Sequence, residues 1–243
     1  MPSRRVLLTA VCLSALVGCN TPGDGVDGRS GSVSDAELRA ICERLHDSGA
    51  ASWGERMAPV VRAGAAAEAL LIQLIDERPS AAGAQASVAT LGRIGGDDAV
   101  GLCRRLVEER SPLSVEAALA LGELPGEPFD GVLLACVQDG FTDATLRTAA
   151  ACALARHGEQ DHAPRWLAAV VRAGTPAGRI DERELCVPTK TRWARERYFI
   201  QRTLRALGHQ DLMEQLDTDA SWPTLERLAP KVEARLRAGI QPR

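Results

Sequence analysis

Residues 84–124 read AQASVATLGRIGGDDAVGLCRRLVEERSPLSVEAALALGEL and contain one helix-turn-helix unit and the start of its copy. Val88, Leu91 and Ile94 recur at helical spacing, so residues 84–94 are expected to form a first helix. Glycines and aspartates are expected to end that helix and to cap the next one: Gly92, Gly95, Gly96, Asp97 and Asp98. The apolar positions of a second helix then follow as one stripe, at Val100, Leu102, Cys103, Leu106 and Val107.

The same pattern recurs along the chain with a period of about 31 residues. Equivalent leucines of the second helices are separated by 31, 31 and 34 residues, at Leu71, Leu102, Leu133 and Leu167. The equivalent apolar residues of the first helices are separated by 31, 30 and 33 residues, at Val60, Leu91, Leu121 and Leu154. Two helix series that advance together predict an array of helical pairs, each burying its apolar stripe against its neighbours.

This pattern resembles the HEAT-like repeat family, in particular the short bacterial form first described in phycobilisome lyases. The matching segments are Thr90–Asp97, Ser114–Gly122 and Thr145–Ala150. The resemblance implies an all-α, right-handed HEAT-like α-solenoid of about five helical pairs with capping helices. An arginine that the family often carries early in the first helix is kept only at Arg147 among Gln85, Glu116 and Arg147.

Both ends of the repeat domain, residues 35–243, have the pattern of capping helices. Ser34 to Glu37 is typical of a helix start. A last amphipathic helix is expected to carry Leu225, Leu228, Val232 and Leu236 on one face. Between them, residues 174–190 have no counterpart in the repeat and are expected to form an insertion before a helix that resumes near Arg192.

The amino-terminal residues have the pattern of a secretory signal. Arg4 and Arg5 precede an apolar run that is too short to span a bilayer, so residues 1–18 are expected to be a signal peptide. Leu16-Val17-Gly18-Cys19 matches the bacterial lipobox, which implies lipidation of Cys19. Residues 19–34 are rich in Gly, Asp and Ser and predict a flexible tether. The alternative is an ordinary cleaved signal with a coincidental cysteine.

Lipidation would hold the domain at the bacterial membrane, since acyl chains such as palmitate anchor proteins stably when more than one is attached. Asn20 follows the cysteine, whereas Asp at this position retains lipoproteins in the inner membrane of enteric-type bacteria. In a cell with two membranes, the outer membrane is therefore the expected site, with the domain facing the periplasm of the cell envelope.

The charge and the cysteine spacing argue against two classes of protein, those that bind nucleic acid and those that bind zinc through cysteines. The formal charge is -3, which argues against nucleic acid, because binding to phosphates needs a basic face. Beyond Cys12 and Cys19 the chain has five cysteines, with no zinc-type spacing: Cys42, Cys103, Cys136, Cys152 and Cys186. Export permits disulfides, but no pairing follows from the sequence. Cys103 and Cys152 lie among apolar residues and are expected to be structural thiols.

We expect the second helices to form an interaction surface for an unidentified envelope protein or complex. Candidate protein-binding residues are Arg104, Arg105, Glu108, Gln138, Arg165, Arg172, Trp193 and Tyr198. The two aromatic residues have an alternative role in sealing the core where the register breaks.

No catalytic motif is present, so the chain is expected to be a non-catalytic scaffold without cofactor or metal. The cluster from His157 to His162 has metal-ligand residue types but falls in a turn of the repeat and lacks helical HExxH spacing. The alternative function is an enzyme, or an accessory protein that binds a ligand or metal, built around the 174–190 insertion and the aromatic helix after it. A purely structural envelope protein is a third possibility.

Overall fold

The computed structural model describes residues 34–49, 53–124, 130–174, 192–218 and 221–238. The chain divides into residues 1–32 and a helical unit of residues 33–243. The signal peptide, Cys19 and nearly all of the tether and of the 174–190 insertion lie outside the described residues. Within the described part the regular elements are all α-helices, which confirms the all-α prediction there.

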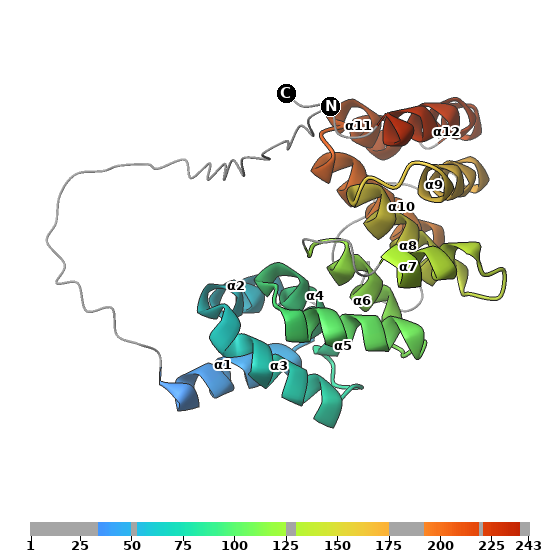
Figure 1. Cartoon of the computed structure of the whole chain (residues 1–243). Helices are drawn as coiled ribbons and strands as arrows, with labels where there is room; N and C mark the ends of the chain where they lie inside the picture. The colour runs from blue at the N-terminus through green and yellow to red at the C-terminus, as the bar shows by residue number, and fades with distance from the viewer. Residues whose placement is uncertain (1–33, 50–52, 125–129, 175–191, 219–220, 239–243) are drawn as a thin grey trace, which may run out of the picture. The chain divides into compact units, whose positions relative to one another are not determined.

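The described residues form twelve helices, which carry their labels in Figure 1. Their bounds are α1 Asp35–His46, α2 Trp53–Ala63, α3 Ala65–Glu77, α4 Ala84–Ile94, α5 Asp97–Glu108, α6 Ser114–Leu121, α7 Asp130–Gln138, α8 Ala144–Arg156, α9 His162–Ala173, α10 Arg192–Ala206, α11 Gln210–Thr218 and α12 Trp222–Arg237. None of the described helices is long and apolar enough to span a bilayer.

Local sequence signals set several helix starts. Ser34 begins α1 as predicted: its Oγ accepts from the Glu37 backbone N–H, and the Glu37 carboxylate accepts from the Ser34 backbone N–H at 3.0 Å. Such a reciprocal capping box satisfies two amide groups that a helix start leaves without partners. Asp143 caps α8 in the same sense by accepting from Thr145 N–H at 2.8 Å.

The start of α5 differs from the expectation. Neither Asp97 nor Asp98 makes a side-chain cap, since both lie in the first turn of the helix and Gly96 occupies the N-cap position. Instead Glu68 of α3 reaches across, and its Oε1 accepts from the Ala99 N–H at 2.8 Å. A carboxylate there also complements the positive end of the helix dipole. The cap is therefore supplied by the preceding helix rather than by adjacent residues.

The apolar positions that define the repeat form the core. The equivalent residues of the first and second helices are all less than a tenth exposed: Val60, Leu71, Ile75, Leu91, Leu102, Leu106, Leu121, Leu133, Val137, Leu154, Leu167 and Val171. Full burial of such a side chain contributes about 1.5–3 kcal/mol relative to an exposed one. The periodicity therefore identified the core correctly.

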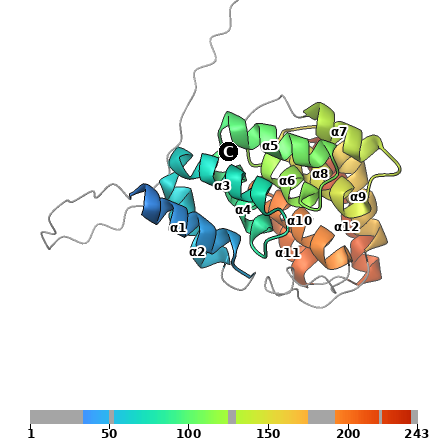
Figure 2. The ribbon, with the colours of Figure 1, turned by 90° about the horizontal axis from the view of Figure 1, so that it is seen from below.

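Successive helices of each series contact one another. Among the second helices, α3 contacts α5, α5 contacts α7 and α7 contacts α9; among the first helices, α4 contacts α6, α6 contacts α8 and α8 contacts α10. Figure 2 shows α5, α7 and α9 following one another along one side, with α4, α6 and α8 inward of them. Each of α3 to α8 thus packs on its equivalent in the next pair.

Two glycines permit the close approach of the first helices. A Cβ at Gly92 would lie 2.8 Å from the Ala120 Cα, and a Cβ at Gly122 would lie 2.7 Å from the Ala153 Cα. Gly92 lies inside α4, which continues to Ile94, so the expectation that Gly92 ends this helix was wrong. Its role is in packing, because no larger residue fits between these backbones.

The turns repeat as well as the helices. Gly95, Gly158 and Gly208 stand at equivalent places after α4, α8 and α10, with φ of 81°, 86° and 80°. Glycine adopts this left-handed conformation without the strain that a Cβ adds. After α8 and α10 the next residue donates back to a leucine carbonyl, Glu159 to Leu154 at 3.0 Å and His209 to Leu204 at 2.8 Å.

Arg147 joins three helices. From α8 its Nε and Nη2 donate to the Val137 carbonyl at the end of α7, at 3.1 and 2.7 Å. Its guanidinium lies 3.8 Å from the ring centroid of Trp166 in α9. A cation over an aromatic face is attracted by the ring quadrupole, so this side chain helps to fix α7 and α9 on α8.

The carboxyl-terminal helix packs as a cap. α12 contacts α9 and α11, and it buries the four apolar residues that the sequence pattern placed on one face: Leu225, Leu228, Val232 and Leu236. Before it, α10 begins at Arg192, as expected, and contacts α8, α9 and α11.

Candidate functional site

The predicted interaction residues are spread over three second helices and α10. Arg104 and Glu108 pair with each other on α5, with 2.8 Å between Nε and Oε1, and about half of each side chain is exposed. Arg105 pairs with Asp76 of α3 at 2.6 Å. The structure therefore groups these three residues on α5, where both arginines already have a carboxylate partner.

The remaining predicted residues lie elsewhere. Gln138 of α7 has its Nε2 3.2 Å from the His162 Nε2 at the start of α9. Arg165 and Arg172 are exposed on α9. These three polar residues follow the second helices but do not join the α5 group.

The aromatic pair on α10 is less accessible. Trp193 is 7% exposed, and its ring fills the space beside Gly174, where a Cβ would lie 2.4 Å from the indole. Tyr198 is half-buried, with its ring centroid 6.4 Å from that of Phe199. This burial favours the sealing role for Trp193, and a role for either residue in partner binding stays a prediction.

A groove of about 410 Å³ runs between α5 and α7, and we call it the α5–α7 groove. It is lined by Arg104, Val107, Glu108, Arg110, Gly131, Val132, Ala135, Cys136, Asp139 and Thr142. Two of the predicted residues, Arg104 and Glu108, thus contribute to it. Its lining combines apolar side chains with two arginines and two carboxylates, a composition typical of binding surfaces.

Beside this groove an ordered turn presents a phenylalanine to solvent. The side chain of Asp139 accepts from the Phe141 N–H at 2.9 Å and from the Thr142 hydroxyl at 2.9 Å. Both hydrogen bonds lower the pKa of Asp139, and the one from the Phe141 amide has the larger effect. Thr142 is buried, whereas Phe141 is 93% exposed. We call residues 139–142 the Phe141 turn.

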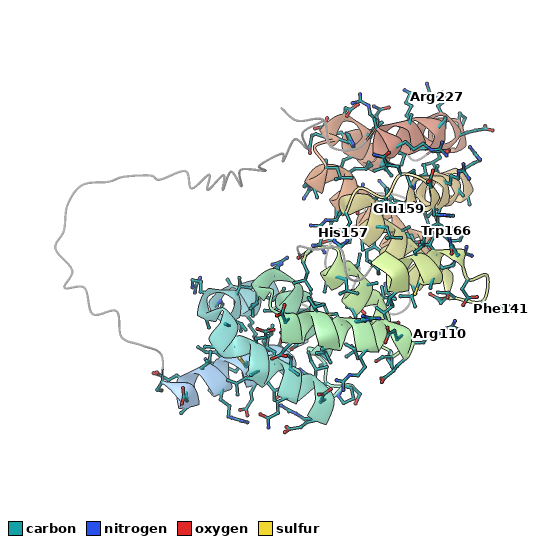
Figure 3. The ribbon with its side chains drawn as sticks, viewed as in Figure 1. Arg110, Phe141, His157, Glu159, Trp166 and Arg227 are labelled. Carbon is teal, nitrogen blue, oxygen red and sulfur yellow. The ribbon has the colours of Figure 1, made fainter. Side chains whose placement is uncertain are left out.

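Arg110 fastens this turn to α5. Its guanidinium donates to the Asp139 carboxylate, and Figure 3 shows Arg110 and Phe141 on the same side of the molecule. Arg110 has a φ of 51°, which lies in the left-handed region. Among the described residues, no other residue except glycine has a positive φ. Glycine occupies the equivalent position, two residues beyond the helix, after α8 and α10, so this backbone strain accompanies an arginine that reaches the Phe141 turn.

Sequence reasoning missed Phe141, Asp139 and Arg110. A signal was present, because the chain has only three phenylalanines and one of them stands in the polar turn Asp139-Gly140-Phe141-Thr142. An aromatic residue in a turn between repeat helices has no place in the buried stripe. The exposure of its side chain, however, depends on how α7 and α8 are joined.

The cluster from His157 to His162 serves the turn before α9. Burial acts to raise the pKa of Glu159, but three backbone N–H groups, those of Asp161, His162 and Ala163, donate to its carboxylate and lower it overall. Over the described residues, no three His, Cys, Asp or Glu side chains come together as metal ligands. Within the cluster, Glu159 thus caps the start of α9.

The thiols of the described helices are protonated at neutral pH. Burial raises the pKa of Cys42 to about 11 and that of Cys103 and Cys152 to about 12. All three are free and buried, and Cys136 is free and half-buried in the α5–α7 groove. Buried neutral thiols are poor nucleophiles, which fits the structural role expected of Cys103 and Cys152. Cys186 lies outside the described residues.

Comparison with protein-family models, with curated proteins and with solved structures finds no match to this chain.

Proposed function

We propose that this chain is a membrane-anchored bacterial lipoprotein with a HEAT-like α-solenoid, and that it acts as a non-catalytic scaffold for proteins of the cell envelope. The observation that carries the proposal is the Phe141 turn, in which a fully presented aromatic side chain stands on a hydrogen-bonded loop beside a groove. Aromatic anchors on rigid supports dominate the binding energy of protein interfaces.

The solenoid part of the proposal draws support from the helix contacts. Equivalent helices pack on each other from pair to pair, and equivalent glycines after α4, α8 and α10 share a positive φ of 80–86°. In solenoids each repeat contacts its neighbours and leaves one continuous face for partners. The second helices, with Arg104, Arg105, Glu108, Gln138, Arg165 and Arg172, would supply that face here.

Lipid anchoring is tested separately from binding. Cells that express the full chain are grown with labelled palmitate, and the wild type is compared with Cys19→Ser. We expect the wild type to incorporate label and to sediment with membranes, and Cys19→Ser to do neither. Label on the Cys19→Ser protein would exclude the lipobox assignment.

The scaffold role is tested by cross-linking in native envelopes, followed by affinity purification of the full chain and mass spectrometry. Two variants alter the proposed surface, Phe141→Ser and the double variant Arg104→Glu with Arg105→Glu. Both should reduce recovery of a recurrent partner at least about tenfold, since truncating an interface anchor commonly costs that much affinity. Helical circular dichroism should be unchanged.

A matched control reverses two charges away from the second helices. Arg62 of α2 and Lys231 of α12 are exposed, so Arg62→Glu with Lys231→Glu makes the same change in net charge elsewhere. This control should retain the partner. If no protein is enriched from wild-type envelopes, or if the control loses the partner as fully as the surface variants, the scaffold proposal fails in this form.

A further inference from the structure

The Phe141 turn and the α5–α7 groove together form a patch on the surface of the described residues. Phe141 is 93% exposed and does not line the groove next to it. An exposed phenylalanine loses the free energy that burial of its ring would give, and the turn that holds it is fixed by three donors to Asp139. The side chain is therefore held outward, where another molecule can reach it.

The groove has the properties of a receptor for such a side chain. Val107, Val132 and Ala135 give it apolar walls, and Cys136 lies half-buried among them. Its volume of about 410 Å³ has room for an aromatic side chain. The patch thus contains both an apolar projection and an apolar recess.

The charges around the recess are balanced. Arg104 pairs with Glu108 along α5, and Arg110 pairs with Asp139 across to α7. Two positive and two negative groups give the rim no net charge, so a strongly acidic or basic partner gains nothing there. A two-fold rotation can set the arginines of such a patch opposite the carboxylates of a second copy, so this charge pattern is compatible with self-association.

We infer that the occupant of this patch is a second copy of the same chain, with the Phe141 ring of each copy seated in the α5–α7 groove of the other. A two-fold interface requires that one surface carry both the projection and its recess, and this patch does. This inference rests on the proposed scaffold function, because it names a second copy of the chain as a partner that binds the surface proposed there.

The test traps the contact as a disulfide in the purified full chain. Gly140 is exposed, and a Cβ there meets nothing within 4 Å, so Gly140→Cys adds a thiol beside an intact Phe141. In the proposed dimer this thiol faces Cys136 of the other copy. With copper-phenanthroline as oxidant, the two Sγ atoms form one bond, release two protons and pass two electrons to the oxidant.

We expect Gly140→Cys to give a dimer on non-reducing gels, at least about tenfold above Gln160→Cys, a control thiol in the exposed turn before α9. Adding Cys136→Ser should abolish this dimer. Adding Phe141→Ser should reduce it about tenfold, because the anchor is lost. A dimer that survives Cys136→Ser, or a yield no higher than that of Gln160→Cys, would overturn the inference.

The two proposals fail in distinguishable ways. If the disulfide dimer is absent while an envelope protein still depends on Phe141, the scaffold role stands and self-association is wrong. If the dimer forms as described while no other protein depends on Phe141, self-association stands and the wider scaffold role is wrong. Sedimentation velocity of the wild type and Phe141→Ser gives a readout of self-association that needs no cysteine.

Discussion

At the scale of single residues, Gly122 limits how closely two helices pack. A Cβ there would lie 2.7 Å from the Ala153 Cα, which is backbone and cannot move aside cheaply. We expect Gly122→Ala to lower the free energy of unfolding by about 1–3 kcal/mol, the usual cost of overpacking. Urea unfolding followed by circular dichroism measures this.

The matched control for Gly122 is Gly101, which lies in α5 with nothing within 4 Å of an added Cβ. Gly101→Ala should raise the free energy of unfolding by about 0.5–1 kcal/mol, because alanine loses less backbone entropy in a helix. Equal effects of the two substitutions would show that helix propensity, and not the contact with Ala153, governs Gly122.

A second residue, His46, links stability to pH. Its Nε2 lies 2.9 Å from the Arg78 carbonyl, which only accepts, so Nε2 carries the proton, and Nδ1 lies 3.1 Å from Ser87 Oγ. Burial lowers the pKa of His46 below its ordinary 6.5. The unfolded chain therefore binds the proton at higher pH than the folded one. The stability that neutral His46 contributes is complete above about pH 6.5 and is lost as the pH falls below it.

We therefore expect the free energy of unfolding to decline from about pH 7 to about pH 5, by at most about 1.4 kcal/mol per pH unit for one histidine. His46→Gln should flatten this slope in urea titrations at a series of pH values. Part of the slope should remain, since burial also lowers the pKa of His209. An unchanged slope in His46→Gln would exclude His46 as its source.

At the scale of elements, α10 is attached to the α6 region by two matched ion pairs. Arg195 meets Glu116 at 3.4 Å, and Arg202 meets Glu123. The two arginines are seven positions apart in the sequence, and so are the two glutamates. Glu123 also lies 3.4 Å from Arg156. Arg93 of α4 lies 3.9 Å from the same carboxylate. Glu123, only 16% exposed, thus holds guanidinium groups from three helices together, α4, α8 and α10.

Removing that carboxylate should loosen α10. We expect Glu123→Ala to cost about 1–2 kcal/mol of unfolding free energy, because partly buried arginines lose a charged acceptor and repel one another. A double-mutant cycle with Arg202→Ala should show coupling. The comparison is Glu108→Ala, whose exposed pair with Arg104 should be worth at most about 0.5 kcal/mol. Similar losses for both variants would contradict a special role of Glu123.

At the scale of the whole molecule, stability should be distributed from neighbour to neighbour. α12 packs on α9 and α11, so deleting residues 222–243 should expose apolar surface of those two helices. In a repeat array such damage decays with distance along the chain. Hydrogen exchange should therefore rise at least about tenfold in α9 and α11 and change little in α1 to α4.

Deleting only residues 239–243, beyond α12, serves as the control and should leave exchange unaltered. A uniform rise in exchange over all helices of the longer deletion would mean that the described helices unfold as one cooperative unit. That result would argue against the nearest-neighbour organisation that the solenoid proposal assumes.

Much of the fold was predictable from local pattern. The 3.6-residue period identified α4, α5 and α12 and their buried residues, because the driving force for burial acts on apolar side chains wherever a helix aligns them. Ser34 was likewise readable as a cap, since it bonds three residues away. The signal, the lipid on Cys19 and the insertion are predictions from pattern that lie outside the described residues.

The candidate site was predicted only in part. Arg104 and Glu108 line the α5–α7 groove, as their polar positions on a second helix suggested, whereas Phe141 and Arg110 were missed. The sequence by itself determined which segments are helical and which faces are buried, because those depend on residues within a few turns of one another. Only the tertiary structure decided that Glu68 caps α5, that Gly92 and Gly122 are packing positions and that Asp139 holds Phe141 outward on Arg110. These contacts join residues about thirty positions apart, and their energy depends on how successive helices approach one another.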